Sequence, residues 1–260
     1  PITSGEDRFM EWKTKDGNYE NTQYAQFDTF FEGIFERERL LDIIKNFICF
    51  SNEGLKQFKI LAGYHQYFAV NKAVESTKHA TETDGKGGVF WHTQGSGKSL
   101  TMIWLSKWLL SNIPTARVLI VTDRDELDEQ IERNYIGVNE TIIRTKSGAD
   151  LLNRLNSHED RLLCSLIHKF GKRGGEATAK DYDRYIEELK ASLPANFSAK
   201  DDIFVFVDEC HRTQSGKLHL AMKTIMPNAI FVGFTGTPLL KNDKATSIEV
   251  FGRYIHTYKF

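Results

Sequence analysis

The sequence predicts an α/β domain with a mostly parallel central sheet flanked by helices, preceded by a helical extension. Through most of the chain, short apolar runs alternate with segments whose apolar residues recur at helical spacing. Residues 203–207 are apolar at every position, as expected of a strand covered on both faces. A glycine-rich loop, residues 93–97, separates an apolar run from a helical pattern. Strands that alternate with helices imply right-handed crossovers, and ligands bind such sheets at the carboxyl ends of the strands.

The first sixty residues differ from the rest. Residues 1–26 are polar and turn-rich, and we expect an irregular segment that packs on the domain. Apolar residues recur at helical spacing over 27–50, which predicts one or two amphipathic helices with their aromatic side chains in the core. A polar break at 51–54 is followed by a short extended piece at 58–61.

The regular alternation follows a predicted helix at 63–80 and a polar loop at 81–88. Pro114, Pro194 and Pro227 each end a predicted helix, because proline removes a backbone donor and disrupts a helix interior. Acidic residues open the helix at 125–135, as the helix dipole prefers. Strands are expected at residues 88–91, 117–121, 141–144, 162–167, 203–207 and 229–234. Helices are expected directly after the glycine-rich loop and at residues 125–135, 149–155, 181–193 and 215–226, with a mobile loop at 171–180 and an extended segment at 248–260.

Composition narrows the classes of protein. A chain of 260 residues with 40% hydrophobic content can bury a sizeable core. A net charge of −1 gives no global basicity, so nucleic-acid binding would need a local basic patch. Cys49, Cys164 and Cys210 lack paired spacing, which argues against a disulfide scaffold or a zinc site and fits a reducing cytoplasm. No apolar run approaches the roughly 18 residues of a membrane span.

The loop at residues 92–99 predicts phosphate binding. Gly95 and Gly97 allow a tight turn whose backbone N–H groups point inward, and the next helix presents its positive end to an anion. Lys98 supplies a mobile charge for the β- and γ-phosphates of ATP, and Ser99 places a hydroxyl where Mg²⁺ would bind. The alternative is a glycine-rich turn with a solvated lysine.

Further residues of this loop are expected to contact the nucleotide, namely Thr93, Ser96 and Leu100. The full phosphate-loop pattern places glycine where this chain has His92, so the match is incomplete.

Asp208 and Glu209 directly follow the apolar run 203–207. A carboxylate at the end of a buried strand is unfavourable unless a cation neutralises it, and Mg²⁺ on a nucleotide is the evident cation. Asp208 would then hold Mg²⁺, while Glu209 would orient and deprotonate the attacking water. The alternative is an acidic pair on the surface or at a helix N-terminus.

These motifs together resemble the superfamily 2 helicases and translocases. The phosphate loop resembles their motif I, and residues 208–211, Asp-Glu-Cys-His, resemble motif II. Thr235, Gly236 and Thr237 resemble motif III, which in that family couples the nucleotide state to nucleic-acid movement. The threonine hydroxyls could bond toward the acidic pair, and the turn could switch between two arrangements. An ordinary turn is the alternative.

A narrower resemblance is to the motor subunit of type I restriction enzymes. It rests on residues 31–44, 64–70, 91–99, 121–124, 208–212 and 233–239 together. It implies a RecA-like P-loop NTPase fold, ATP and Mg²⁺ as cofactors, translocation of double-stranded DNA before cleavage, and modification and specificity subunits as partners. It also implies that Gln66 helps to read adenine, with Tyr64 or Phe58 stacking on the base. Thr122, Arg124, His168 and Lys169 lie where related motors contact the DNA backbone.

The resemblance further divides the chain. Residues 1–60 would be the extension from a nuclease region, 61–245 the first RecA-like ATPase domain, and 246–260 the start of a connection to a second motor domain. We expect such a fragment to bind Mg·ATP, to hydrolyse it slowly and to cut nothing. Two alternatives stay open. One is another superfamily 2 helicase acting on RNA or DNA. The other is a nucleotide-gated interaction domain, against which the presence of Glu209 argues, because a pure binder does not need a water-orienting group.

Overall fold

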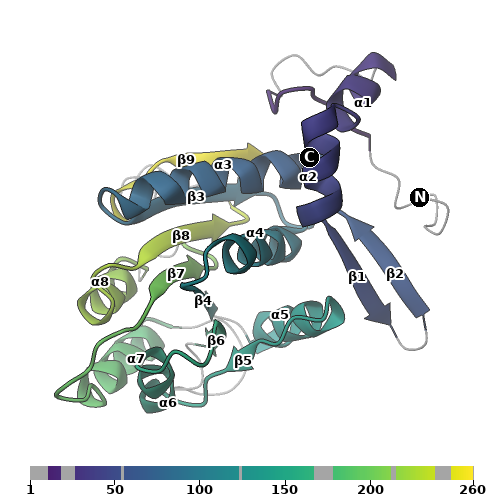
Figure 1. Cartoon of the computed structure of the whole chain (residues 1–260). Helices are drawn as coiled ribbons and strands as arrows, with labels where there is room; N and C mark the ends of the chain where they lie inside the picture. Colours follow the sequence, from purple (N-terminus) through teal and green to yellow (C-terminus); the bar gives the residue numbers. More distant parts are fainter. Residues whose placement is uncertain are drawn as a thin grey trace.

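A seven-stranded parallel sheet forms the centre of the molecule, as predicted (Figure 1). The computed structural model describes residues 11–18, 27–53, 56–122, 125–166, 178–211, 215–237 and 247–259. The strand order is β5-β6-β4-β7-β8-β3-β9, and every neighbouring pair is parallel. The strands are β3 (Lys86–His92), β4 (Ala116–Thr122), β5 (Ile143–Arg144), β6 (Leu162–Leu166), β7 (Asp202–Val207), β8 (Ile230–Thr235) and β9 (Tyr254–Tyr258).

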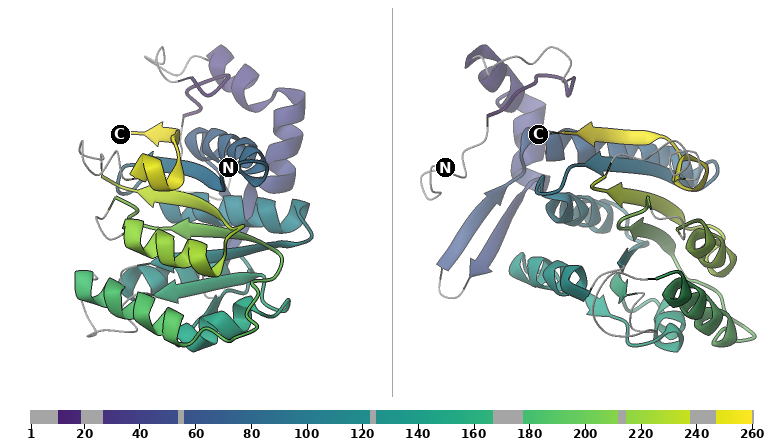
Figure 2. Two further views of the ribbon diagram at one scale, coloured as in Figure 1. Left: turned by 90° about the vertical axis from the view of Figure 1, so that its left-hand side faces the viewer. Right: turned by 180° about the vertical axis from the view of Figure 1, so that it is seen from behind.

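Helices cover both faces of this sheet (Figure 2). Alternate side chains of β4 show the arrangement: Val118 and Ile120 join one apolar cluster, and Leu119 and Val121 join the other. The first cluster includes residues of α3 (Tyr64–Thr81), α4 (Lys98–Asn112) and α5 (Asp125–Gly137). The second includes residues of α6 (Gly148–Leu155), α7 (Ala179–Ala191) and α8 (Ser215–Ile225). The described residues contain no helix long and apolar enough to cross a membrane.

The segment at 27–50 was only partly predicted. Two helices, α1 (Phe27–Ile34) and α2 (Arg37–Asn46), are present, but the helical prediction is wrong beyond them. Strand β1 (Ile48–Glu53) pairs antiparallel with β2 (Lys56–Leu61), and the expected break at 51–54 lies largely within β1. A short apolar run fits both periodicities, and the choice was settled by pairing with β2 and by burial of one strand face at Cys49.

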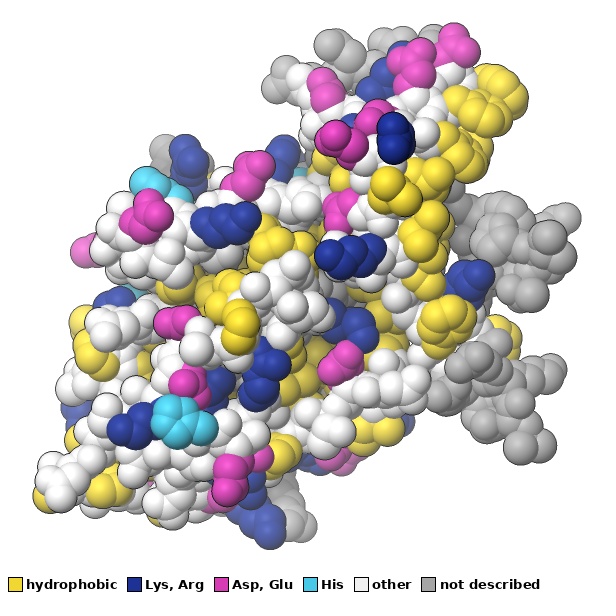
Figure 3. All heavy atoms as spheres, in the orientation of Figure 1, with side chains coloured by type: hydrophobic (Ala, Val, Ile, Leu, Met, Phe, Trp, Pro, Cys, Tyr) yellow, Lys and Arg dark blue, Asp and Glu magenta, His cyan; other side chains and the backbone are white. Residues whose placement is uncertain are grey.

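The aromatic side chains of α1, and of Phe35 just after it, do not lie in the core, which corrects a second expectation. Phe27 is 77% exposed, and Phe30, Phe31 and Phe35 are also exposed. They stack mainly on one another, with the rings of Phe27 and Phe31 4.5 Å apart. Hydrophobic side chains accordingly gather along one edge of the molecule over α1 and α2 (Figure 3).

Both ends of the described chain contact the central domain. Trp12 is buried against Tyr64, Tyr67 and Phe68 of α3, so this part of the segment packs on the domain as expected. Strand β9 adds an edge strand to the sheet beside β3, so the sheet continues past the boundary that we placed at residue 245. The boundary at residue 60 cuts through β2.

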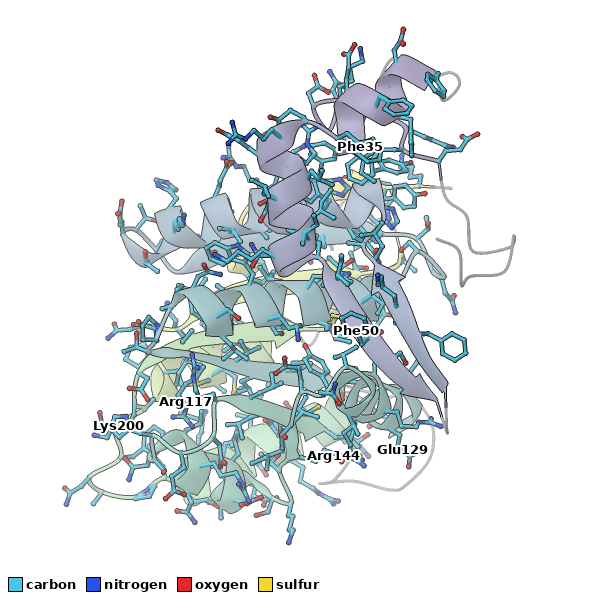
Figure 4. All side chains as sticks on the ribbon, turned by 45° about the vertical axis from the view of Figure 1, so that its right-hand side comes forward. Phe35, Phe50, Arg117, Glu129, Arg144 and Lys200 are labelled. Atoms are coloured by element: carbon cyan, nitrogen blue, oxygen red, sulfur yellow. The ribbon has the colours of Figure 1, made fainter. Side chains whose placement is uncertain are left out.

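Arg117 of β4 is a buried cation whose burial was not predicted from the sequence. Its side chain is 2% exposed, although it belongs to β4. It donates hydrogen bonds to four backbone carbonyls, those of Arg154 (2.8 Å), Leu155 (3.1 Å), Asp160 (2.8 Å) and Lys200 (3.4 Å). Figure 4 shows Arg117 beside Lys200 at this edge of the domain. The guanidinium therefore joins the end of α6 to the segment that leads into β7.

Candidate nucleotide site

The predicted phosphate loop connects β3 to α4. Gly95 (φ 84°) and Gly97 (φ 80°) both have left-handed backbone conformations, which side chains other than glycine rarely adopt. A Cβ atom at Gly97 would also lie 2.7 Å from Nε2 of Gln66. The loop thus needs glycine at this position for both its backbone angle and its close contact with α3.

Two consecutive residues at the start of α3 bond to the loop. Nε2 of His65 lies 2.9 Å from the Ser96 carbonyl oxygen, and Nε2 of Gln66 donates to the Gly97 carbonyl at 3.2 Å. The other amide atom of Gln66, Oε1, accepts from the Gly63 N–H at 2.9 Å. Gln66 is 5% exposed and does not line the cavity described below, so in this structure its amide serves the loop and the start of α3.

A cavity of about 1430 Å³ opens beside the loop and joins the separate motifs. Its walls include Gln94, Gly95, Gly97, Lys98, Ser99 and Leu100 from the loop and α4, Asp208, Glu209 and His211 after β7, and Gly236 and Thr237 after β8. Thr93 and Ser96 do not line it, and neither do Tyr64 and Phe58, the two rings expected to stack on a base. Tyr64 is instead enclosed by Trp12, His65 and Tyr258.

The far wall of the cavity comes from elements that sequence reasoning did not assign to the site. Ser51 and Ile60 of the β1–β2 hairpin line it together with Gln130, Arg133 and Asn134 of α5 and Asn139 just after this helix. No signal in the sequence marked these residues, since polar side chains on a helix normally face solvent. Only the packing of α5 beside α4 brings them to the loop.

The acidic pair lies where it was predicted, at the end of β7. Asp208 is 4% exposed, and its N–H donates to the Val121 carbonyl at 3.0 Å. Glu209 has a positive φ of 50°, which is uncommon for a residue with a side chain. The cavity wall thus combines a hydroxyl (Ser99), two carboxylates and a lysine, a donor set that fits Mg²⁺ together with phosphate oxygens.

His211 connects the acidic pair to the Thr235 turn. Its Nδ1 lies 3.2 Å from Oε2 of Glu209 and 2.9 Å from Oγ1 of Thr235. The same Thr235 hydroxyl accepts from the Thr237 N–H at 3.2 Å. A Cβ atom at Gly236 would lie 2.9 Å from Nζ of Lys98, so this turn approaches the lysine directly. The expected link between turn and carboxylates therefore passes through an imidazole.

Among the predicted DNA contacts, Thr122 lies in the described part of the chain. Thr122 ends β4, and its side chain is fully buried, so its hydroxyl does not face solvent in this conformation. Arg124, His168 and Lys169 lie outside the described residues. Of the four, the structure therefore locates only Thr122.

A family model for the SWI2/SNF2 ATPases matches residues 65–260, three quarters of the chain. The chain belongs to the SWI2/SNF2 ATPase family. The match covers the phosphate loop, the acidic pair and the Thr235 turn. It also confirms the superfamily expected from the motifs.

Named relatives of this SWI2/SNF2 ATPase are restriction enzyme subunits. The chain is 34% identical to the type I restriction enzyme HindI endonuclease subunit of Haemophilus influenzae, over 96% of this chain and 25% of that protein. It is 30% identical to the SauCOLORF180P endonuclease subunit of Staphylococcus aureus, over 95% of this chain and 24% of that one. The chain thus spans about a quarter of the length of the curated relatives it matches.

Comparison with solved structures supports the fold of this chain and nothing about its function. The UvsW helicase from bacteriophage T4 superposes with a TM-score of 0.52 at 15% identity, covering 84% of this chain and 67% of that one. A nuclease-deletion mutant of the type ISP restriction-modification enzyme LlaGI superposes with a TM-score of 0.51 at 18% identity, covering 77% and 20%. The SWI2/SNF2 chain described here therefore has the RecA-like architecture that its motifs implied.

Behind the phosphate loop of this SWI2/SNF2 ATPase lies a buried histidine pair. His92, which replaces the expected glycine, has Nε2 2.8 Å from Nδ1 of His256 in β9. Burial, followed by the nearby His256, lowers the pKa of His92 to about 2. Burial also lowers the pKa of His256 to about 3. The charged groups facing the pair are Lys98 and Lys72, with His65 close to both rings, and these oppose protonation further.

We expect this pair to make the fold sensitive to acid. Because both folded-state pKa values lie below the ordinary value near 6.5, the unfolded chain binds more protons, so stability rises with pH up to about 6.5 and then levels off. Each histidine should cost roughly 2 kcal/mol of unfolding free energy between pH 7 and pH 5. Urea unfolding at several pH values between 5 and 7 measures how steeply the unfolding free energy changes with pH. This pH dependence should be clearly weaker for His92→Gln than for the exposed control His79→Gln. Equal slopes for the two variants would contradict a neutral buried pair.

Proposed function

We propose that this chain is the ATP-binding lobe of a motor that translocates double-stranded DNA, within the restriction subunit of a type I restriction–modification enzyme. One observation carries the proposal: Lys98, Ser99, Asp208 and Glu209 line a single cavity, although the two pairs are more than a hundred residues apart in sequence. The identity with restriction enzyme endonuclease subunits supports the biological setting.

Each residue has a role that its position allows. Lys98 would neutralise the β- and γ-phosphates, and the loop N–H groups would bind the phosphate oxygens. Ser99 and Asp208 would hold Mg²⁺, which on binding neutralises phosphate charge. Glu209 would accept the proton of the attacking water. Of the remaining expected contacts, Leu100 would pack on the nucleotide. Gln66 remains our proposed adenine contact and would have to turn toward the cavity, because it is 5% exposed and not part of the cavity wall.

Coupling to DNA would run through the Thr235 turn. A change in the hydrogen bonding of Glu209 can reach Thr235 and Thr237 through His211, because these groups form one connected chain. Loss of the γ-phosphate would remove a charge near Lys98 and Gly236 at the other side of the same turn. Thr122, Arg124, His168 and Lys169 remain our proposed contacts to the DNA backbone, with Thr122 requiring a rearrangement that uncovers it.

The setting of the motor is part of the same proposal. Modification and specificity subunits would be its partners, and the cytoplasm its compartment. Residues 1–60 would link it to a nuclease region and 246–260 to a second motor domain. A second lobe would supply further cationic groups to the transition state, so this chain alone should bind Mg·ATP well and hydrolyse it slowly.

Nucleotide-dependent nucleic-acid binding tests this proposal against its rivals. We expect fluorescence anisotropy to show that the chain binds a blunt duplex DNA. The affinity for this DNA should differ at least threefold between the Mg·ATP-analogue and Mg·ADP states, and single-stranded DNA and RNA should bind more weakly. A preference for RNA would favour an RNA helicase. Tight Mg·ATP binding without any nucleic-acid binding would favour a nucleotide-gated interaction domain. For a DNA motor or an RNA helicase, Lys98→Ala should abolish the effect of the nucleotide on nucleic-acid affinity.

A further inference from the structure

His65 occupies an unusual place behind the phosphate loop. Its ring is 2% exposed and does not line the cavity, yet its Nε2 lies 2.9 Å from the Ser96 carbonyl oxygen. A carbonyl oxygen only accepts, so the proton of the neutral ring must be on Nε2. Burial lowers the pKa of His65, which keeps this ring neutral beside the loop.

This hydrogen bond sets the direction of a backbone donor. In a trans peptide, the carbonyl of one residue and the N–H of the next point to opposite sides. Holding the Ser96 carbonyl toward His65 therefore turns the N–H of Gly97 away from α3, and Gly97 lines the cavity. The backbone at Gly97 has φ of 80°, in a region with several accessible peptide orientations for glycine, so an external anchor matters here.

The same ring is held by strand β9. The rings of His65 and Tyr258 stack with centroids 4.0 Å apart and an interplanar angle of 15°. The Tyr258 carbonyl accepts from the Thr93 N–H at 3.1 Å, at the first residue of the loop. Strand β9 thus contacts the loop at two points, directly at Thr93 and through His65 at Ser96.

We propose that His65 is a positioning residue of the phosphate loop, which aims the Gly97 N–H at the nucleotide and ties the loop to Tyr258 on β9. This inference rests on the proposed nucleotide site. It predicts that Tyr258, which does not line the cavity, influences nucleotide affinity. It also couples the position of β9 to nucleotide binding at the loop, so a change in one alters the other.

The test uses the whole chain and two readouts. Calorimetric titration measures the affinity for a non-hydrolysable Mg·ATP analogue, and hydrogen exchange measures residues 93–99 in the nucleotide-free protein. His65→Leu should weaken the affinity for the Mg·ATP analogue about tenfold and speed hydrogen exchange in the loop. The substitution removes the hydrogen bond to the Ser96 carbonyl, which holds the Gly97 N–H toward the cavity. His65→Gln, which keeps a donor, should recover most of both effects. The matched control is His219→Leu, on α8 against Phe231 in the opposite helical layer.

A second pair keeps the idea testable if His65→Leu does not fold. Tyr258→Leu removes the stacked ring and should weaken affinity about threefold, whereas Tyr258→Phe keeps the ring and should bind nearly as the unmodified chain does. A folded His65→Leu variant with unchanged affinity and unchanged loop exchange would overturn the proposal. Failure of the unmodified chain to bind Mg·ATP would instead contradict the proposed function, while loop exchange would still report on the anchoring role of His65.

Discussion

Replacing Glu209 with glutamine is expected to slow ATP hydrolysis by about 100- to 10,000-fold, the usual contribution of a general base. Glutamine has nearly the same shape and still accepts a hydrogen bond from His211, but its amide cannot take a proton from water. The affinity for Mg·ATP should stay within about threefold, because the loss concerns the transition state and not ground-state binding. Single-turnover hydrolysis with excess protein suits the slow rate expected of this chain.

The control for this variant is Glu129→Gln, which removes a charge from the exposed side of α5 outside the cavity (Figure 4). It should leave both the rate and the affinity unchanged. If Glu209→Gln hydrolysed ATP as fast as the unmodified chain, Glu209 would not be the base. If the variant lost nucleotide binding as well, the acidic pair would serve mainly to hold the metal.

Replacing Arg117 with methionine is expected to lower the unfolding free energy by about 3–5 kcal/mol, because each buried carbonyl left without its donor costs about 1–3 kcal/mol and three of the four bonds are only partly buried. Four backbone carbonyls would lose their donor, and two of them, at Arg154 and Leu155, belong to the end of α6. Carbonyls at a helix end have no partner within the helix, and a cation there also complements the helix dipole. In a chain of this size, the midpoint of thermal unfolding should fall by roughly 10 °C.

Arg117→Lys provides a graded comparison. A lysine keeps the charge, but its compact ammonium cannot span four carbonyls as the planar guanidinium does, so an intermediate loss is expected. The exposed Arg37, at the start of α2, supplies the control Arg37→Met, for which the change should stay within about 0.5 kcal/mol. An equally small change for Arg117→Met would mean that water replaces the guanidinium without cost.

Local motifs were predictable from sequence, and contacts between distant segments were not. The phosphate loop and the Asp208–Glu209 pair follow apolar strands directly, so their chemistry and their place at the sheet edge could both be inferred. Strand β1 was missed because Ile48 and its neighbours fit a helical as well as an alternating pattern, whereas the extended piece predicted at 58–61 lies within β2. The exposed rings of α1 were assigned to the core, since an amphipathic pattern does not say what covers the apolar face.

The site itself was predicted only on one side. Nothing in the sequence indicated that α5 would line the cavity, or that His92 would meet His256 across 164 positions. Arg117 was likewise hidden, because a charged residue in a strand is normally solvated at its edge. In each case the decisive partner is a backbone group or a ring contributed by a remote element, which periodicity and motif spacing do not encode.

The place of β3 in the sheet has a consequence for how the chain folds. The strand that carries the phosphate loop lies between β8 and β9, which come after the other strands of this sheet in the described part of the chain. During synthesis from the amino terminus, β4, β6 and β7 can pair while β3 still lacks both neighbours. Pairing of β3 with β8 and β9 is slow, because the entropy cost of closing the long intervening segment comes before the strand contacts stabilise the sheet. The nucleotide pocket is therefore expected to form after the β4, β6 and β7 part of the sheet, and until then two unpaired edges of β3 would be exposed to chaperones or to aggregation.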